Sequence, residues 1–314
     1  MQTPILNFEV GQTYVGFFYV KSVEVRQNKL NKPYLDFTLS DATSEINGKL
    51  WEVSDKEVDL YHSGDIIAVK MEITSWQDQK QAKILMLRPS NSEDEIDMGS
   101  IVPIAPIDPK QMYDEIYSIA ESLTNQELRA MSISVLEEYK EKLMIYPAAK
   151  SNHHSFRSGL LYHLLRMIRV ARALCDIYSA NFELLYTGIV FHDMQKITEM
   201  NISPIGLVTE YSKEGTLIGH IVEGIVDVDK RAEKLGVSDE VKLLIKHMVL
   251  SHHGEPEYGS PIKPLFLEAQ LLHFIDNIDA TVFDFQRATE NIEKGTFSNK
   301  IFSLDKRSVY LPNL

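Results

Sequence analysis

The residues best suited to chemistry are a histidine and an aspartate that stand side by side in an apolar segment. His192 and Asp193 lie in LYTGIVFHDMQK, residues 185–196, and Lys196 follows three residues after the aspartate. A buried carboxylate without a partner costs several kcal/mol, so Asp193 on an apolar helix needs a cation. A metal ion is the natural candidate, because Mn, Fe, Co and Zn ions accept imidazole nitrogens and carboxylates as ligands.

Five further residues with ligand groups stand on other expected elements. They are His163 upstream and His220, His252, His253 and Asp276 downstream. Each has an ordinary interpretation by itself: an inward histidine is more often a core residue than a ligand, and an aspartate can cap a helix. Together, in this order and on separate apolar helices, they favour a metal site assembled in the middle of a helical bundle.

Length and composition limit the classes of protein to consider. The 314 residues favour two domains over one. Cys175 is the single cysteine, which excludes an internal disulfide framework, and we see neither a signal peptide nor an apolar run of membrane-spanning length. We therefore expect a cytoplasmic protein with no membrane partner. The net charge of -13 argues against coating duplex DNA, but not against a local groove for a single strand.

The first part of the chain is typical of a small β barrel. Between about residues 12 and 88 we expect five short strands at 14–25, 34–40, 46–51, 65–74 and 82–87, with a short helix at 54–60. Leu35, Phe37 and Leu39 alternate onto one face, which we expect to be the interior. Five strands with a connection at this point suit an oligonucleotide-binding (OB) barrel.

The rest of the chain is expected to be helical after a connector. Residues 89–109 are acidic and rich in proline, which is typical of an extended linker. From residue 110 apolar residues recur at helical spacing, and we expect long helices over 182–197, 216–235, 241–250 and 265–291 among others. The predicted organisation is an OB domain at 1–88, a linker at 89–109 and an all-α domain at 110–314.

The order of the candidate ligands resembles that of a known enzyme class. His163, the pair His192-Asp193, and Asp276 match the pattern of HD-domain metal-dependent phosphohydrolases. Longer stretches resemble one branch, the YhaM-type 3′-5′ exoribonucleases, which join an N-terminal OB domain to a C-terminal HD domain. These stretches are SNHHSFRSGLLYH at 151–163, LSHHGEPEYGSP at 250–261, FIDNIDA at 274–280 and the tail IFSLDKR at 301–307.

The resemblance implies a role for each candidate. His163, His192, Asp193 and Asp276 would hold a first metal ion, and Asp193 would bridge to a second ion completed by His220 and His252. His253 would be a further ligand or a proton-transfer and phosphate contact. Lys196 would meet a phosphate oxygen, or else be a solvated lysine at a helix end. Some three-metal relatives carry a glutamate four residues before the first histidine; here that position is Gly159.

The expected activity is 3′-5′ hydrolysis of single-stranded RNA to nucleoside 5′-monophosphates by a hydroxide activated between two metal ions. Manganese is the first expectation, with Fe, Co, Ni and Zn as alternatives, and single-stranded DNA is a second candidate substrate. The competing hypotheses are an HD phosphohydrolase of free or cyclic nucleotides and a DNA-binding replication or regulatory factor. The sequence leaves a homo-oligomer open.

We expect the barrel to bind the single-stranded nucleic acid. OB barrels stack bases on aromatic side chains and contact phosphates with cations. Alternation places Tyr34, Lys49 and Trp51 on the outer face, and Trp76 lies near a hairpin. We expect these four residues to bind nucleic acid; the alternative is that the aromatic rings pack against other parts of the protein.

Overall fold

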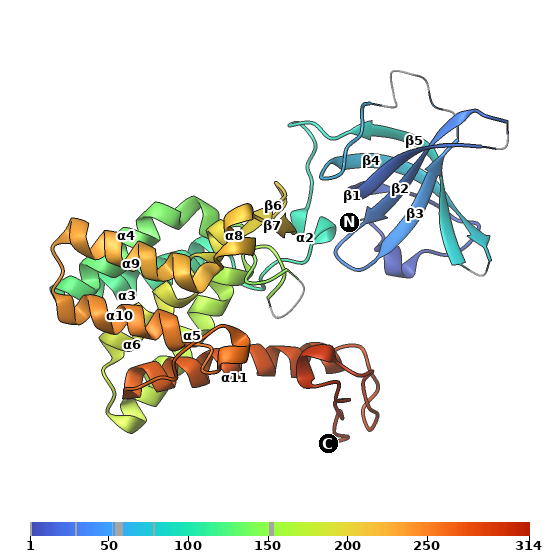
Figure 1. Ribbon diagram of the computed structural model, residues 1–314. Helices are drawn as coiled ribbons and strands as arrows, with labels where there is room; N and C mark the ends of the chain where they lie inside the picture. The colour runs from blue at the N-terminus through green and yellow to red at the C-terminus, as the bar shows by residue number, and fades with distance from the viewer. Residues whose placement is uncertain (1, 29, 52, 54–58, 78, 151–153) are drawn as a thin grey trace. The chain divides into compact units, whose positions relative to one another are not determined.

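A computed structural model describes residues 2–28, 30–51, 53, 59–77, 79–150 and 154–314. The chain forms two compact units, Met1–Ile104 and Ala105–Leu314. The first is a β barrel and the second is mainly helical (Figure 1), which confirms the predicted fold class.

The barrel has five strands. They are β1 (Thr13–Gln27), β2 (Pro33–Ser40), β3 (Glu45–Leu50), β4 (Ile66–Trp76) and β5 (Gln79–Pro89). The barrel closes in the order β1-β2-β3-β5-β4, and every pairing is antiparallel except the parallel pair β3–β5. Most of the segment expected as a short helix, residues 54–58, lies outside the described residues. The 3-10 turn η1 (Ile5–Asn7) precedes the first strand.

Alternation along the strands builds the barrel core. Leu35, Phe37 and Leu39 are fully buried, as expected, because successive side chains of a strand point to opposite faces. The register of β1 shifts between Val20 and Ser22, where it pairs with β2. Such a bulge bends a strand, and β1 pairs with β4 through its first half and with β2 through its second half. One long bent strand therefore helps to close the barrel.

The segment expected as an extended linker is partly packed. Helix α2 (Met98–Ile101) is capped by Asp97, and Ile101 and Val102 are buried. The boundary between the two units falls after Ile104, inside the segment 89–109. Composition averaged over the whole segment concealed these two buried apolar residues. The Ala42 N–H donates to the Ser100 carbonyl, which ties α2 to the first unit.

The second unit is a bundle of helices with one small hairpin. Its helices are α3 (Pro109–Ser122), α4 (Gln126–Leu143), α5 (Gly159–Tyr178), α6 (Phe182–His192), α7 (Lys196–Glu199), α8 (Lys213–Leu217), α9 (His220–Leu235), α10 (Asp239–Ser251) and α11 (Leu267–Thr289). Strands β6 (Met200–Ile202) and β7 (Val208–Tyr211) form the hairpin, and η2 (Pro256–Tyr258) and η3 (Phe302–Leu304) are 3-10 turns.

Helix α6 is the centre of this bundle. Every residue from Leu184 to His192 is buried, because α6 packs against α4, α5, α9, α10 and α11 (Figure 1). A helix that is apolar on all sides is a core helix. The side chain of Asn181 caps its first turn by accepting from the Leu184 N–H.

Two helices are shorter than their apolar patterns predicted. The helix expected over 182–197 ends at His192, because the backbone leaves the helical conformation at Asp193. The helix expected over 216–235 is interrupted at Gly219, whose φ of 79° lies in the left-handed region that favours glycine. Both interruptions place candidate ligands at helix ends, a position that apolar periodicity does not reveal.

Among the described residues, no helix combines the length and the apolar character needed to cross a bilayer. The cytoplasmic location stays a prediction.

Candidate metal centre

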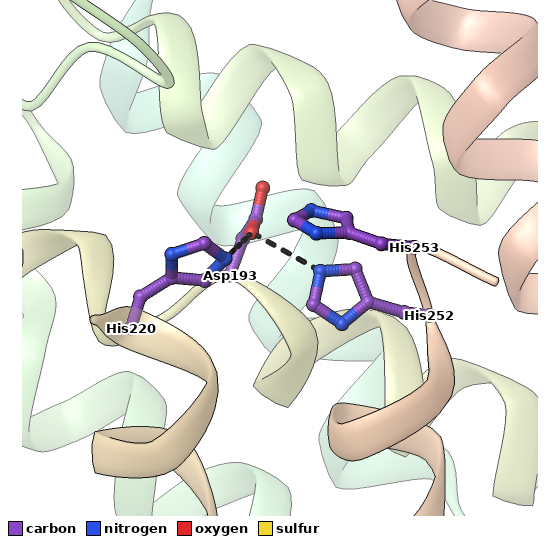
Figure 2. Close-up of side chains that lie close together, drawn as sticks. All are labelled: Asp193, His220, His252 and His253. Atoms are coloured by element: carbon purple, nitrogen blue, oxygen red, sulfur yellow. Dashed lines mark ion pairs between the residues drawn. The ribbon is translucent and has the colours of Figure 1, made fainter. Parts of the chain in front are cut away.

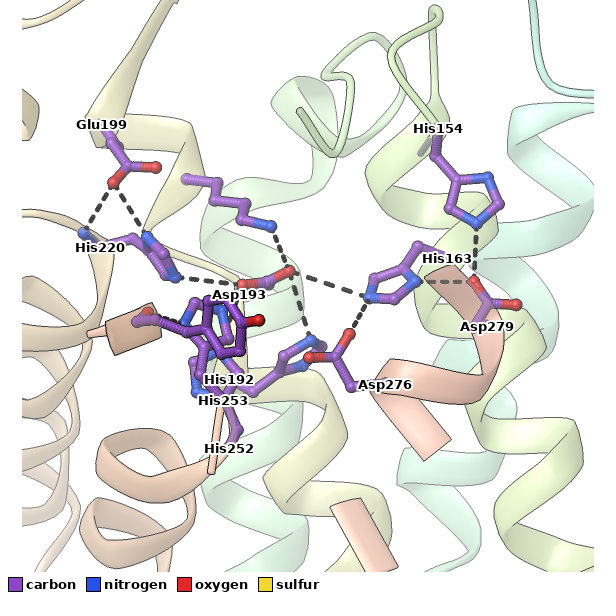
Figure 3. Close-up of polar contacts among 12 residues, drawn as sticks. His154, His163, His192, Asp193, Glu199, His220, His252, His253, Asp276 and Asp279 are labelled. Carbon is purple, nitrogen blue, oxygen red and sulfur yellow. Dashed lines mark hydrogen bonds and ion pairs between the residues drawn. The ribbon is translucent and has the colours of Figure 1, made fainter. Parts of the chain in front are cut away.

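The bundle gathers the candidate ligands around the C-terminal end of α6. His192 is the last residue of α6 and Asp193 follows it, while His220 is the first residue of α9 and His252 follows the end of α10. The two remaining ligands, His163 and Asp276, come from within α5 and α11. Figure 3 shows these side chains converging on one another. All six predicted ligands therefore lie in one cluster.

The carboxylate of Asp193 lies between two sets of histidines. Its Oδ2 is 3.8 Å from His163 Nε2 and 3.3 Å from His192 Nε2. Its Oδ1 is 3.4 Å from His220 Nε2 and 3.7 Å from His252 Nε2. The two oxygens of one carboxylate thus face different imidazoles.

Two overlapping groups of ligand atoms share Asp193. In one group the ligand atoms of Asp193, His220, His252 and His253 lie within 4.8 Å of one another (Figure 2). In the other group the ligand atoms of His163, His192 and Asp193 also lie within 4.8 Å of one another. Asp276 Oδ1 lies 3.3 Å from His163 Nε2, which places a second carboxylate beside the latter group.

The histidine rings are held by their Nδ1 atoms. His192 Nδ1 lies 2.7 Å from the Ile189 carbonyl, and His252 Nδ1 lies 2.7 Å from the Val249 carbonyl. Carbonyl oxygens only accept, so these Nδ1 atoms carry the proton and Nε2 keeps its lone pair. His220 Nδ1 is 2.9 Å from Glu199 Oε1. Anchoring one ring nitrogen while the other is aimed inward is typical of metal-binding histidines.

The inward atoms fit metal ions. The Nε2 atoms of His192, His220 and His252 and the Oδ1 atom of Asp193 are buried and have no hydrogen-bond partner among the described residues. Buried polar atoms are rarely left without a partner, because their desolvation is costly. Nitrogen and oxygen donors that converge in this way are the ligands of first-row divalent ions.

Asp279 and Glu199 are functional candidates that our sequence reasoning missed. Asp279 Oδ2 is 2.8 Å from His163 Nδ1 and 2.6 Å from His154 Nε2, and its Oδ1 accepts from Arg166 Nε at 2.5 Å (Figure 3). Asp279 is three residues after Asp276, so the spacing i, i+3 placed both on one helix face and was an available signal. Glu199 had no comparable signal, because only the tertiary fold brings α7 to His220.

The electrostatics of the cluster are strongly coupled. Burial acts to raise the pKa of Asp193, but the neighbouring Lys196 and His192 outweigh it and hold that pKa well below its usual value. Burial acts to lower the pKa of His163, but Asp276 and Asp279 raise it to about 9. Burial lowers the pKa of His252 well below its usual value. Asp193 is therefore ionised and His252 neutral at pH 7, as metal ligands must be.

Lys196 lies inside the cluster, contrary to the interpretation as a solvated helix end. It is largely covered, and its Nζ donates to Asp193 Oδ2 at 2.6 Å. Burial acts to lower the pKa of this lysine, but the Asp193 carboxylate raises it above its usual value. Gly159 stands at the position where some three-metal relatives carry a glutamate. A side chain at this position would collide with the carbonyl oxygen of His154. No ligand-bearing side chain fits there.

The cluster opens onto a cavity of about 440 Å³. Lys196, His252, His253 and Asp276 line it together with Tyr258, His273, Asn277, Ala280, Thr281, Asp284 and Ser303. His253 Nδ1 lies 2.5 Å from the Tyr258 carbonyl, so His253 is also held with Nε2 available. Burial lowers the pKa of His253, which keeps the ring neutral at pH 7.

The aromatic residues predicted to bind nucleic acid differ in exposure. Trp51 is 43% exposed and Trp76 is 68% exposed, but Tyr34 is only 9% exposed, because the Trp51 ring covers it at a centroid distance of 4.7 Å. Tyr34 therefore does not present the open face that alternation predicted. Lys49 Nζ lies 5.8 Å from the Tyr34 ring and 5.7 Å from the Trp51 ring. Trp51 and Lys49 thus form one surface with Tyr34 beneath.

The chain is similar to known proteins over its whole length. The HD domain family model matches residues 160–281. A protein of Halalkalibacterium halodurans named 3′-5′ exoribonuclease YhaM is 36% identical over 314 residues, which cover 100% of this chain and 97% of that protein. The chain belongs to the YhaM family. A family member from a Geobacillus species is also 36% identical, over 99% of this chain and 96% of its own.

The family membership applies to both units, since the relatives match the chain from end to end. A member from Listeria welshimeri is 36% identical over 99% of each chain. Among solved structures, a domain of replication protein A from Methanococcus maripaludis matches 28% of this chain and 94% of that domain, at 18% identity and a TM-score of 0.24.

Proposed function

We propose that this protein is a metal-dependent 3′-5′ exonuclease that hydrolyses single-stranded RNA to nucleoside 5′-monophosphates. The observation that carries the proposal is the buried carboxylate of Asp193, whose two oxygens face the Nε2 atoms of different histidines. Relatives that match the whole chain and are named 3′-5′ exoribonucleases support the direction and the substrate.

These nitrogen and oxygen donors are best suited to hold two metal ions. His163, His192, Asp193 and Asp276 would hold one, and His220, His252 and His253 would hold the other with Asp193 shared. Manganese is our first expectation. Mixed imidazole and carboxylate sites accept several first-row ions and availability decides among them, so Fe, Co, Ni and Zn are alternatives. When bound, such ions make water more acidic and neutralise charge on a phosphoryl group.

The protein groups around the ions have separate tasks. Glu199 and Asp279 hold the rings of His220 and His163 through Nδ1 and so aim Nε2 inward. Lys196 keeps Asp193 ionised and lines the cavity, where its ammonium would meet a phosphate oxygen. His253, if it is not a ligand, is neutral at pH 7 and would accept a proton at Nε2. Hydrolysis by water would break the P–O3′ bond of the terminal linkage and release the last nucleotide with its 5′-phosphate.

The barrel would hold the strand. A base stacked on Trp51 would gain roughly 1–3 kcal/mol, and Lys49 lies close enough to that ring to contact the adjoining phosphate. We propose the same role for Trp76, and Tyr34 would support Trp51 from below. Single-stranded DNA is a second candidate, because stacking and phosphate contacts do not read the 2′-OH.

The test is the degradation of a 5′-labelled single-stranded RNA by the full-length protein with manganese, with and without EDTA. We expect a ladder that shortens one nucleotide at a time and nucleoside 5′-monophosphates as products, all abolished by EDTA. A circular RNA should resist, since it has no 3′ end. Cleavage of the circle at a comparable rate would mean an endonuclease, and activity only on mononucleotides would favour the alternative of a nucleotide phosphohydrolase.

Asp227→Asn is a suitable control for effects on folding. Asp227 pairs with the buried Arg231 on α9, at 2.9 Å, and contributes to the packing of the same unit. This variant should lose stability but keep the EDTA-sensitive ladder at saturating manganese. Asp193→Asn, by contrast, should abolish the ladder.

A further inference from the structure

Two exposed aromatic residues have no part in the proposed chemistry: one lies on the wall of the metal-site cavity, and the other is the sequence neighbour of a wall residue. Tyr258 lines the cavity and is 70% exposed. Phe302 is 83% exposed and precedes Ser303, which lines the same cavity. Exposing large aromatic surface forfeits the burial free energy that such side chains normally supply. Aromatic rings left open on a cavity wall, or next to a wall residue, are therefore candidates for contact with a ligand.

Tyr258 is tied directly to the metal cluster. It ends the turn η2, which Pro256 begins and Gly259, with a φ of 97°, terminates. Its carbonyl oxygen accepts from His253 Nδ1 at 2.5 Å. The turn that carries the ring therefore also positions a candidate ligand, and the backbone of Tyr258 is held beside the cluster.

Phe302 is held by a hairpin in the C-terminal tail. Bridges between Phe297 and Tyr310 and between Ile301 and Arg307 close the hairpin, and Leu304 is buried beneath its tip. The turn η3 contacts α11, and the Arg307 guanidinium lies 6.0 Å from the ring of Phe285 on that helix. The tip is thus fixed against the C-terminal half of α11, and Ser303 reaches the cavity from there.

The hairpin tip also carries positive charge in an acidic protein. Lys306 Nζ lies 6.0 Å from the Phe302 ring, and the next residue, Arg307, pairs with Asp305 at 3.8 Å. Lys306 and the preceding Asp305 both have positive φ, at 59° and 55°. Non-glycine residues adopt this conformation at a cost, and such strain concentrates at ligand-binding loops. An aromatic ring beside a cation is the combination that binds a base and its phosphate.

The length of the cavity wall matches a short piece of single strand. Asp276 lies in the metal cluster, and Asp284, eight residues later on α11, lines the same cavity. Eight helical residues span about 12 Å, and stacked nucleotides rise about 3.4 Å each. The wall therefore has room for about three stacked nucleotides between the cluster and the hairpin.

We propose that Tyr258 and Phe302 form an aromatic clamp for the last few bases of the RNA strand, with Lys306 at the phosphates. This clamp rests on the proposed exonuclease function and adds to it a base-binding site within the helical unit. It would bind any base, since every base offers a face for stacking, and it would orient the terminal linkage toward the metal cluster.

The experiment uses the full-length protein with manganese and two substrates. One is a short oligoadenylate, and the other is the same oligomer with its last three nucleotides abasic. We compare kcat/KM for the native protein with that of Tyr258→Ala, Phe302→Ala and the conservative Tyr258→Phe. Tyr178→Ala is the matched control, because Tyr178 is an exposed aromatic residue of α5 that lines a different groove.

On the oligoadenylate each alanine variant should lose about five- to a hundred-fold in kcat/KM, while Tyr258→Phe and Tyr178→Ala should match the native protein. On the abasic oligomer the native protein should itself be slower, and the alanine changes should add little. Equal losses on both substrates, or no loss on either, would overturn the clamp and leave the exonuclease proposal intact. Failure of the native protein to shorten RNA at all would instead overturn the proposed function, and the clamp with it.

Discussion

Replacing Asp279 by asparagine tests whether the residues behind the ligands tune the site. Asp279 is buried and holds His163 Nδ1 at 2.8 Å, so the variant keeps the shape and an acceptor oxygen but loses the charge. The charge makes His163 a stronger ligand but also binds its proton more tightly. Burial acts to lower the pKa of His163, yet Asp276 and Asp279 raise it to about 9.

The two effects separate with pH. Loss of such an outer partner typically weakens metal affinity by about 10- to 100-fold. At pH 9.5 His163 is neutral in most molecules of either protein, so the Asp279→Asn variant should show most of this loss. At pH 7 metal binding to the native protein must first displace the extra proton of His163. For each unit by which the pKa of His163 is lower in the variant, about tenfold of the lost metal affinity is restored at this pH. The difference between the two proteins should therefore shrink at pH 7.

The assay is titration of metal-free protein with manganese at pH 7 and pH 9.5, followed by calorimetry. Breaking a buried ion pair costs about 3–5 kcal/mol, so the folded fraction must be checked by circular dichroism at each pH. Asp227→Asn, which breaks the ion pair with Arg231 in the same unit, should keep native affinity at both values. Equal affinity of Asp279→Asn and the native protein at pH 9.5, or a loss that is larger at pH 7, would refute the reasoning.

The same structure leads to four more predictions. Asp193→Asn should abolish hydrolysis and reduce bound metal, as measured by elemental analysis, while the helical circular dichroism persists; near-native activity of a pure sample would contradict a shared carboxylate. Manganese binding at pH 7 should release about one proton from His163, seen as a dependence of the calorimetric heat on buffer ionisation. The raised pKa of His163 means that its protonation stabilises the metal-free fold, fully below pH 6.5 and no longer once the pH has risen through 9. The thermal midpoint of the metal-free protein should therefore fall between pH 6.5 and pH 9. Trp51→Ala should raise KM for long RNA about five- to a hundred-fold, and an equal rise for a dinucleotide would make Trp51 a packing residue.

The sequence by itself determined the two architectures and the ligand types. Alternation of apolar residues such as Leu35, Phe37 and Leu39 identifies barrel strands, because side-chain direction in a strand depends only on position. The His192-Asp193 pair in an apolar segment identifies a cation site, because a buried carboxylate needs a partner wherever the segment lies. Both signals are local, and neither needs knowledge of the neighbouring elements.

The tertiary structure alone decided how those groups are held. Glu199 reaches His220 and Asp279 reaches His163 across helices that are distant in the chain. The spacing of Asp276 and Asp279 indicates a shared helix face, but it does not report which histidine lies against that face. Lys196 turned inward for the same reason: the end of α6 at His192 let the chain bend so that its ammonium meets Asp193. Tyr34 was expected to be open and is covered by Trp51 of the neighbouring strand end. Local pattern fixes which face a residue belongs to, whereas packing fixes what lies against that face.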